Sequence, residues 1–528
     1  MPHHVASIGL STVPGNDEDE RGGGPAEGLT RRALGGMKWT YGSTVAIATL
    51  QIGYTAVMGR LLADTDFGLI AMAQVFLNFG QHFANAGVAS ALVQKPAVSR
   101  SDIRVAITSS AVLGLLLAGG VVVAAPLAGQ LFDTPDVVAV VRVMAAALLL
   151  QALGHTSVGL LRRDLRFKTL AGVEVAGHGV GYLAVGVGMA LAGFGVWSLV
   201  AAAIGSQALR TIIAYGAVRH SLRPLMRWQE FKVLYGYGGR LSVISFLEFV
   251  GTNLDVLVIG RFAGQGSLGQ WNRAALLITL PFGYAIGGLS KVLFPTFSKI
   301  QADIVRVRRG YLGAVGFTAA LVAPTAAGMA AASNELIPVL LGPGWEEAAT
   351  ILPWLALTGV AGMLSHFGGI VCDATAELNR KLVLQLSYLL VLGAGLFLVR
   401  AESLMAIAMV VAGAQVLRHL LYMGLMSRVL GVTATQYRDA YLPAIATAAV
   451  VGAAVWGCSL GATATEVPAV AVLAVQMVVG AVVLLAALRR GPLAPIRRQL
   501  RERLRVAGLL DADGSRAARR LAGLLGDP

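Results

Sequence analysis

Three polar residues interrupt an apolar segment near the middle of the chain. In LEFVGTNLDVLVIGRF (247–262), Glu248, Thr252 and Asp255 follow one another at intervals that place them on one face of a helix. Ionisable groups inside an apolar helix are costly and are functional candidates by default. A carboxylate here could bind H⁺ or Na⁺ during a transport cycle, so Asp255, Glu248 and Asn253 are candidate ion-coupling residues. The alternative is a structural pair or a group that faces water in a cavity.

Two arginines occupy matching positions in similar hexapeptides, GSQALR (205–210) and GAQVLR (413–418). Guanidinium groups bind phosphate oxygens in a two-pronged geometry, so Arg210 and Arg418 are candidates for holding a phosphorylated substrate. Their symmetry also suits a repeated packing role, or side chains that extend to the membrane surface. Lys291 is a third candidate cation.

A stripe of neutral amides, Gln74, Asn78, Gln81 and Asn85, follows one face of another apolar segment. Amides at this spacing suit the hydroxyl groups of a sugar in a cavity, and they equally suit hydrogen bonds between helices. A further pair, Glu174 and His178, lies one helical turn apart. A local pair is the simpler interpretation of these two residues, and a proton relay is the alternative.

The composition decides which class of protein positions these residues. Of 528 residues, 56% are hydrophobic and only 13% are charged, whereas soluble domains carry about 25% charged residues. The chain is therefore expected to be an all-α polytopic membrane protein. The net charge of +14 would suggest nucleic acid in a soluble protein, but we expect no nucleic-acid partner here. The two cysteines, Cys372 and Cys458, lie in apolar segments and indicate neither a disulfide framework nor a metal site.

A membrane-spanning helix needs about 20 mostly apolar residues, and fourteen segments meet this need. They are residues 38–61, 67–93, 104–125, 137–160, 170–191, 195–217, 241–260, 274–297, 311–332, 350–372, 382–399, 403–427, 440–460 and 468–488.

The basic residues set the expected orientation, since cytoplasmic loops are rich in Lys and Arg. With both termini in the cytoplasm of a multi-pass cell-membrane protein, most of the 42 Lys and Arg residues lie on the inner side. The outer loops then hold Arg60, Arg261, Arg273 and Arg400, of which Arg60 and Arg261 are interpreted as anchors at the membrane surface.

The chain contains an internal repeat. MGRLLADTDFG recurs as IGRFAGQGSLG 201 residues later in the chain. The hexapeptides GSQALR and GAQVLR lie 208 residues apart. This repeat predicts two six-helix lobes related by a pseudo-two-fold axis along the membrane normal, with a substrate path between them. The expected organisation is a disordered cytoplasmic tail (1–36), an N-terminal lobe (37–218), a cytoplasmic linker (219–240), a C-terminal lobe (241–428), two extra helices (429–489) and a basic tail (490–528). That tail suits an amphipathic helix on the inner leaflet, or simply a solvated segment.

Three stretches resemble a known family. They are EFVGTNLDVLVIGRFAGQGSLGQWNRAALL (248–277), LPFGYAIGGLSKVLFPTFSKIQAD (280–303) and LLGPGWEEAATILPWLAL (340–357). They are similar to the Wzx-type lipid-linked oligosaccharide flippases of the multidrug/oligosaccharidyl-lipid/polysaccharide exporter superfamily. The resemblance spans roughly residues 30 to 430. It implies alternating access and the movement of a polyprenyl-pyrophosphate-linked glycan from the inner to the outer leaflet.

We therefore expect a transporter without a cofactor, except for H⁺ or Na⁺ as a coupling ion. Its expected partners are the lipid-linked glycan, membrane lipids, and glycan polymerase or assembly proteins. Two alternatives stay open at this point. One is a drug or cation antiporter of the same superfamily, and the other is a non-transporting component or enzyme of glycan assembly. Walker, GxSxG and HExxH motifs are absent from the sequence, which disfavours an enzyme.

Overall fold

The computed structural model describes residues 25–84, 98–225, 239–463, 467–489, 491 and 493. The helices are α1 (Pro25–Leu61), α2 (Asp64–Ala84), α4 (Arg100–Phe132), α5 (Asp136–Arg163), α6 (Phe167–His178), the π-helix η1 (Gly179–Val187), α7 (Gly188–Leu191), α8 (Val196–Val218), α10 (Gly239–Phe262), α11 (Gly264–Ile300), α12 (Ile304–Ala331), α13 (Ser333–Leu341), α14 (Glu346–Ala374), α15 (Leu378–Leu398), α16 (Leu404–Leu430), α17 (Ala434–Thr463) and α18 (Ala469–Arg489).

The all-helical architecture follows from the apolar composition. A lipid-exposed backbone must satisfy its hydrogen bonds internally, and a helix does so within one segment. Polar residues mark where these helices begin: Ser99 and Asp102 form a capping box at α4, and Asp303 and Ser403 cap α12 and α16. The described part of the chain contains no strand.

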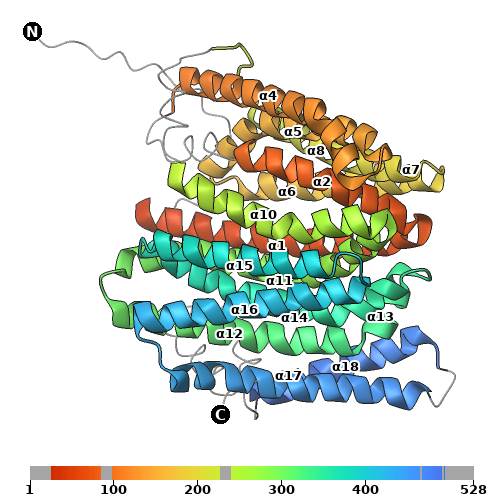
Figure 1. Cartoon of the computed structure of the whole chain (residues 1–528). Coiled ribbons are helices and arrows are strands. Elements are labelled where there is room, and N and C mark those ends of the chain that lie inside the picture. Colours follow the sequence, from red (N-terminus) through yellow and green to blue (C-terminus); the bar gives the residue numbers. More distant parts are fainter. Residues whose placement is uncertain are drawn as a thin grey trace, which may run out of the picture.

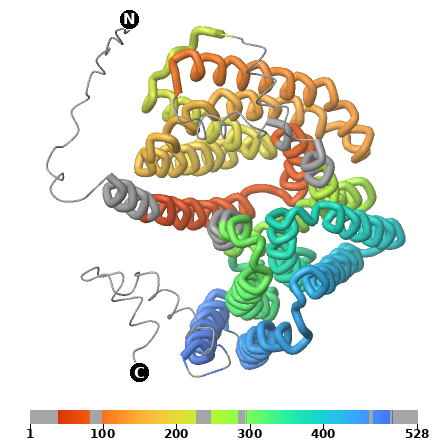
Figure 2. The backbone as a smooth tube through the Cα atoms, turned by 90° about the vertical axis from the view of Figure 1, so that its left-hand side faces the viewer, coloured from red at the N-terminus to blue at the C-terminus, as the bar shows by residue number. Residues whose placement is uncertain are grey.

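The helices run roughly parallel to one another and form two groups (Figure 1). The N-terminal lobe comprises α1, α2, α4, α5, the continuous segment α6–η1–α7, and α8. The C-terminal lobe comprises α10, α11, α12, α14, α15 and α16. Viewed along the helices, the two lobes lie on either side of α1, and α17 and α18 lie at the far edge of the C-terminal lobe (Figure 2). The predicted fold class is thus confirmed.

Ten described segments are long and apolar enough to cross a membrane. The four other predicted spans fall in α1, α2, α10 and α11. These are the first two helices of each lobe, and they carry most of the polar candidates named above. Two of these helices, α2 and α11, pack tightly against each other where the two lobes join.

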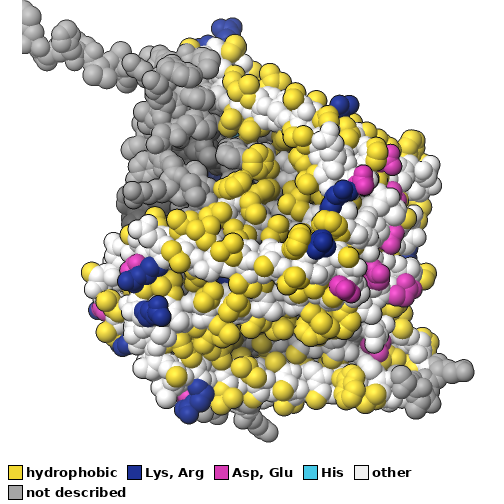
Figure 3. Space-filling view, in the orientation of Figure 1, with side chains coloured by type: hydrophobic (Ala, Val, Ile, Leu, Met, Phe, Trp, Pro, Cys, Tyr) yellow, Lys and Arg dark blue, Asp and Glu magenta, His cyan; other side chains and the backbone are white. Residues whose placement is uncertain are grey.

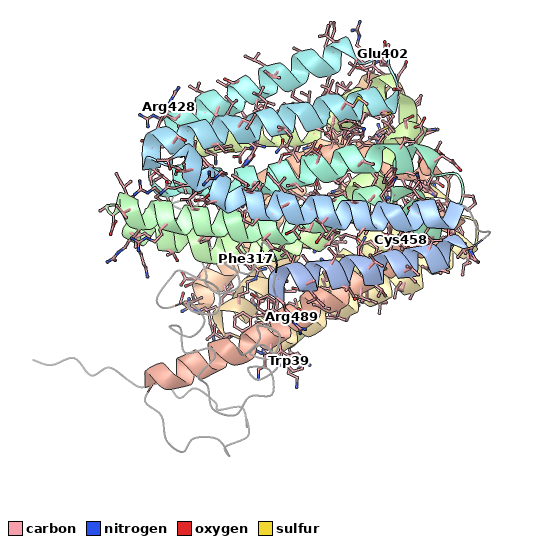
Figure 4. All side chains as sticks on the ribbon, turned by 90° about the horizontal axis from the view of Figure 1, so that it is seen from below. Trp39, Phe317, Glu402, Arg428, Cys458 and Arg489 are labelled. Atoms are coloured by element: carbon pink, nitrogen blue, oxygen red, sulfur yellow. The ribbon has the colours of Figure 1, made fainter. Side chains whose placement is uncertain are left out.

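The two ends of the molecule differ in charge. Following the predicted orientation, we call the end that contains the α1–α2 turn (62–63) the outer end, and the opposite end the inner end. Figure 3 shows a hydrophobic middle zone, with most of the visible acidic residues at the outer end, beside a few basic ones, and further basic residues at the inner end. Glu402 and Arg428, at opposite ends of α16, illustrate this polarity (Figure 4). The arrangement is that of a multi-pass membrane protein.

Several predicted features lie outside the described residues. These are Asn85, linker residues 226–238, residues 1–24 of the N-terminal tail and residues 494–528 of the basic tail. The backbone of Lys291 belongs to α11, but its side chain is not among those described.

Candidate functional site

A cavity of about 290 Å³ lies inside the C-terminal lobe, and we call it the C-lobe cavity. Helices α10, α11, α14, α15 and α16 all contribute to its wall. Its polar lining includes Asp255 and Thr252 from α10, Trp271 from α11, and Gln415 and Arg418 from α16. The cavity thus brings together the carboxylate of Asp255, the guanidinium of Arg418 and the aromatic rings of Trp271 and Tyr388 from distant parts of the sequence.

Asp255 is held by one neighbour and is otherwise unsatisfied. Its Oδ2 accepts a hydrogen bond of 3.1 Å from Trp271 Nε1. Its Oδ1 is shielded from solvent and has no hydrogen-bond partner among the described residues. A buried carboxylate oxygen without a partner is costly, and it is suited to accept a proton or to bind a cation. The geometry therefore keeps Asp255 as the ion-coupling candidate.

Glu248 and Asn253 occupy other positions, although they belong to the same helix. Glu248 Oε1 lies 3.1 Å from Lys381 Nζ, and that ammonium group also pairs with Asp373 at 2.9 Å. Asn253 is buried and donates to the carbonyl oxygen of Phe249, one turn earlier in α10. These contacts are structural, so the three candidates do not form one site in this structure.

The two symmetric arginines each bind inside their own lobe. Arg418 Nη2 donates to Gln385 Oε1 at 3.1 Å, and its guanidinium lies 4.8 Å from the centre of the Tyr388 ring. Arg210 Nη2 hydrogen-bonds to His178 Nδ1, and Nη1 lies 3.5 Å from Glu174. Arg210 of α8 thus contacts both Glu174 and His178, the two residues that the sequence suggested as a local pair.

The amide stripe of α2 is only partly described. Gln74 Nε2 donates to Asn78 Oδ1 at 2.8 Å, so two of the four amides bind each other within the helix. Gln81 is half-buried. This pairing satisfies one donor and one acceptor and leaves the remaining amide groups available for a hydroxylated ligand.

Arg273 was missing from the predicted site. The expectation that it belongs to an outer loop is wrong, because α11 begins at Gly264 and Arg273 lies in its third turn. Its guanidinium covers the Phe67 ring of α2 at 4.4 Å, across the lobe boundary. Its Nε is shielded from solvent and lacks a hydrogen-bond partner in the part of the chain described. The one signal in the sequence was the polar run QWNR (270–273), which resembles a loop.

Arg60 and Arg261, interpreted from the sequence as anchors at the membrane surface, contact the opposite lobe. Arg60, at the end of α1, donates to the carbonyl oxygens of Val339 and Leu340 in α13. Arg261, at the end of α10, pairs with Asp133 of the N-terminal lobe at 2.9 Å. Each of these arginines therefore connects its lobe to the opposite one at the outer end.

A second cavity, of about 350 Å³, lies between the C-terminal lobe and the two extra helices, and we call it the lateral cavity. Helices α12, α13, α17 and α18 line it with almost entirely apolar side chains. Gln476 is its main polar group, and its Nε2 donates to Ser459 Oγ at 2.8 Å. The lining is suited to a hydrocarbon chain and not to a sugar or a phosphate.

Comparison with known proteins decides the family. The family described as "Polysaccharide biosynthesis protein" matches residues 57–350, more than half of the chain. The chain belongs to this family. The match covers the lobe boundary, the C-lobe cavity's acid and the contacts at the outer end, since Arg60, Asp255 and Arg273 all fall within it.

Individual members of the polysaccharide biosynthesis family extend the match. The teichuronic acid biosynthesis protein TuaB of Bacillus subtilis is 26% identical over 458 residues, which is 86% of this chain and 94% of TuaB. The lipopolysaccharide biosynthesis protein WzxC of Escherichia coli is 24% identical and covers 64% of this chain and 69% of its own length.

Among solved structures, a lipid II flippase, MurJ, in an inward closed conformation has a similar fold. Its TM-score is 0.64 at 13% identity, and the match covers 88% of this chain and 99% of MurJ. An inward-facing multidrug resistance transporter of the MATE family is similar with a TM-score of 0.50 at 16% identity, over 75% of this chain and 95% of its own. At these identities the likeness concerns the fold alone.

Proposed function

We propose that this protein moves a polyprenyl-pyrophosphate-linked oligosaccharide from the inner to the outer leaflet of the cytoplasmic membrane. The two lobes would expose a shared path alternately to each side, with both termini in the cytoplasm. Membership of the polysaccharide biosynthesis family supports this proposal, as does the similarity to the biosynthesis proteins TuaB and WzxC and to the fold of the lipid II flippase MurJ. Such a substrate has three chemical parts, and each part needs a different kind of contact.

Arg273 is the observation that carries the proposal. It is a cation at the lobe boundary whose only side-chain hydrogen bond among the described residues is to the neutral neighbour Asn272. A positive charge in that position lacks a carboxylate to neutralise it, so an anionic ligand would be stabilised there. The planar guanidinium group donates hydrogen bonds in a geometry that fits the acceptor oxygens of pyrophosphate. We assign the pyrophosphate of the substrate to Arg273, ahead of Arg210 and Arg418, which already have partners within their lobes.

The other two parts of the substrate have separate candidates. The lateral cavity would accept part of the polyprenyl chain, because its lining is apolar and its walls belong to membrane-spanning helices. The amide groups of Gln74, Asn78 and Gln81 would bind sugar hydroxyls. Asp255 would bind the coupling ion, H⁺ or Na⁺, in the C-lobe cavity.

A second candidate function is the export of an organic cation. The C-lobe cavity supports it, since Trp271 and Tyr388 surround the carboxylate of Asp255 there. Arg418 opposes it, because a guanidinium in the same cavity repels a cationic ligand. The two functions differ in whether a cationic drug or an anionic lipid competes for transport.

The test is transbilayer movement of a labelled polyprenyl-pyrophosphate oligosaccharide in liposomes that contain the purified protein. Arg273→Gln removes the proposed phosphate contact, and hydrogen bonds to charged groups contribute about 1.5–3 kcal/mol. Flipping at low substrate concentration should therefore fall about 10- to 100-fold. Arg400→Gln is the matched control, since Arg400 is a half-buried arginine of the outer end whose guanidinium lies 4.0 Å from the centre of the Phe397 ring.

Wild-type flipping by Arg273→Gln would contradict the assignment of pyrophosphate to this residue. A wild-type protein that moves no lipid would contradict the proposed function itself. Cleavage or joining of the glycan by the purified protein would instead support an enzyme of glycan assembly. Drug-dependent proton or sodium exchange without lipid movement would support the organic-cation exporter.

A further inference from the structure

The same polar arrangement is built twice, once in each lobe, with one chemically important difference. In the C-terminal lobe, Arg418 binds Gln385. In the N-terminal lobe, Arg210 binds His178. The repeat offset that relates the two arginines also relates the two acceptors to within one residue. A histidine that can take up a proton therefore stands where the other lobe has an amide that cannot.

The N-terminal arrangement is a continuous cluster, and we call it the N-lobe cluster. It consists of Glu174, His178, Tyr182 and Arg210. The Arg210 guanidinium contacts His178 and lies 3.5 Å from Glu174, while the His178 ring stacks on Tyr182 with centroids 5.1 Å apart. The Arg210 Nε is buried without a hydrogen-bond partner among the residues described.

The backbone is adapted to hold this cluster. A Cβ at Gly177 would overlap with the Arg210 side chain, so the glycine lets the arginine lie across α6. The π-helix η1 begins at Gly179, directly after His178. Segments of π-helix are rare and occur frequently at functional sites. The histidine that distinguishes the N-terminal lobe from the C-terminal lobe is therefore also the residue at which the helix changes from α to π geometry.

We propose that the N-lobe cluster is a proton-binding site, with His178 as the group that takes up the proton. Arginine cannot give up its proton in a protein, so the Arg210 N–H donates and His178 Nδ1 must accept with its lone pair. A proton from water that binds Nδ1 removes this acceptor and places two cations side by side. Arg210 must then leave His178, and the imidazolium and the guanidinium compete for Glu174.

The neighbours of His178 define what else could compensate the added charge. His178 faces Arg210 of α8 and Tyr182 of η1. On the far side of Tyr182 lies Tyr54 of α1, with the centroids of the two tyrosine rings 5.0 Å apart. The remaining helix packed on α6 is α5, whose titratable residues include His155, Arg162 and Arg163. Glu174 is thus the carboxylate of the cluster, and one carboxylate cannot neutralise both cations.

The C-terminal lobe shows the opposite solution. Lys381 stands at the repeat position of Glu174, so a cation replaces the acid there. Its ammonium group pairs with Glu248 and Asp373. Asp255 takes the repeat position of Tyr54. Each lobe thus holds one group that can exchange a proton near its arginine, His178 in the N-terminal lobe and Asp255 in the C-terminal lobe.

This inference rests on the proposed function for its role in transport, but the proton site can be tested without transport. In protein with ¹⁵N-labelled histidines in lipid nanodiscs, the His178 signal is identified by its loss in His178→Gln. We expect the His178 ring to change from a neutral acceptor to an imidazolium on acidification between roughly pH 7 and 4, since the Arg210 guanidinium opposes a second cation beside it. A ring that stays neutral over this whole range would overturn the proposal.

The transport readout is the pH profile of flipping. His178→Gln copies the neutral acceptor of the C-terminal lobe and keeps a partner for Arg210. We expect it to flatten the pH dependence of flipping in the acidic range in which the His178 ring takes up its proton. His155→Gln, a partly buried histidine of α5, is the matched control and should keep the wild-type profile. A wild-type profile in His178→Gln would overturn the proposal, whereas a wild-type protein that flips nothing at any pH would contradict only the proposed function.

Discussion

Arginines that look alike in the sequence have three different environments in the structure. Arg210 and Arg418 bind partners within their own lobes. Arg60 and Arg261 connect the lobes at the outer end. Arg273 stands at the lobe boundary with no carboxylate partner in the described chain. Because charge inside a membrane must be compensated, an arginine at the lobe boundary without a carboxylate partner would gain from an anionic substrate.

Asp255→Asn is the corresponding test of the coupling acid. The amide keeps the volume of the carboxylate, and its oxygen can still accept from Trp271 Nε1, but it cannot bind a proton and attracts a cation weakly. We expect ion-driven flipping to fall at least about tenfold, as for the loss of one charged hydrogen bond, with normal membrane insertion. Flipping under an imposed pH or Na⁺ gradient measures this. Undiminished transport would remove Asp255 from the mechanism.

His220 provides a pH prediction outside the membrane-spanning helices. It follows α8, is buried, and shares a hydrogen bond of 2.9 Å with Ser157 Oγ. Burial lowers the pKa of His220 below its ordinary value of 6.5. The unfolded chain therefore binds more protons, so stability is complete above pH 6.5 and decreases as the pH falls toward the folded-state pKa.

His220→Asn should weaken this acid sensitivity while keeping a polar partner for Ser157. The measurement is the thermal unfolding midpoint in detergent between pH 8 and roughly 5. An equal loss of stability on acidification in the variant and in the wild type would show that other groups dominate.

The sequence predicted which polar residues lie inside apolar helices better than it predicted which side chains they contact. The acid Asp255 and the arginines Arg210 and Arg418 were recognisable because polar groups are rare in apolar helices. Their partners were not, since Trp271, Gln385 and Tyr388 come from other helices whose rotation is set by packing. Arg273 was missed because α11 continues outward past the apolar segment to Gly264.

At the scale of elements, the repeated glycines explain how α2 and α11 cross. A Cβ at Gly68 would overlap with the carbonyl oxygen of Gln265, and a Cβ at Gly269 with that of Asp64. These two contacts are exchanged by the repeat, since Gly269 and Gln265 are the counterparts of Gly68 and Asp64. The pseudo-two-fold axis therefore passes through this crossing at the outer end.

Gly68→Ala should separate the two helices at the crossing. The added methyl group meets backbone, which cannot move aside, and overpacking of this kind costs roughly 1–3 kcal/mol. We expect a lower unfolding temperature and greater labelling of outer-end cysteines by a membrane-impermeant reagent. Gly119→Ala in α4 is the matched control, because a Cβ at Gly119 meets nothing within 4 Å. Equal labelling of both variants would show that the crossing does not close the outer end.

The elements themselves were largely predictable. Each of the fourteen expected spans overlaps a helical segment in the described part of the chain, since apolar length identifies a membrane helix directly, whereas residues 85–93 of the second span lie outside the described residues. The short helix α13 was not expected, because residues 333–349 read as an outer loop. Its carbonyl groups hold Arg60, and the adjoining Trp345 donates from Nε1 to the Gly59 carbonyl oxygen at 3.0 Å. Such contacts between lobes leave no periodic pattern in a sequence.

At the scale of the whole molecule, the outer end is closed by contacts between the lobes. Arg60 with α13, Arg261 with Asp133, and the crossing of α2 with α11 all lie there. Under the proposed mechanism these contacts must separate to release the glycan on the outer side. The acidic character of the outer end would then disfavour the return of an anionic lipid (Figure 3).

A disulfide across this closure tests whether it must open. A Cβ built at Gly59 of α1 lies 3.2 Å from the Cβ of Leu341 in α13, close to the spacing that a disulfide requires. In a background with Cys372→Ala and Cys458→Ala, Gly59→Cys with Leu341→Cys should cross-link on oxidation and stop flipping. Reduction should restore it, while oxidised Gly59→Cys alone should stay active. Full activity in the cross-linked protein would show that release does not need this opening.

The most direct test of the central claim is the transbilayer movement of a labelled polyprenyl-pyrophosphate oligosaccharide in liposomes containing only the purified protein. We predict that the protein moves the label to the opposite leaflet well above the rate in protein-free liposomes, and that Arg273→Gln slows this movement about 10- to 100-fold while Arg400→Gln does not. Movement no faster than in protein-free liposomes, under every ion gradient applied, would contradict the account.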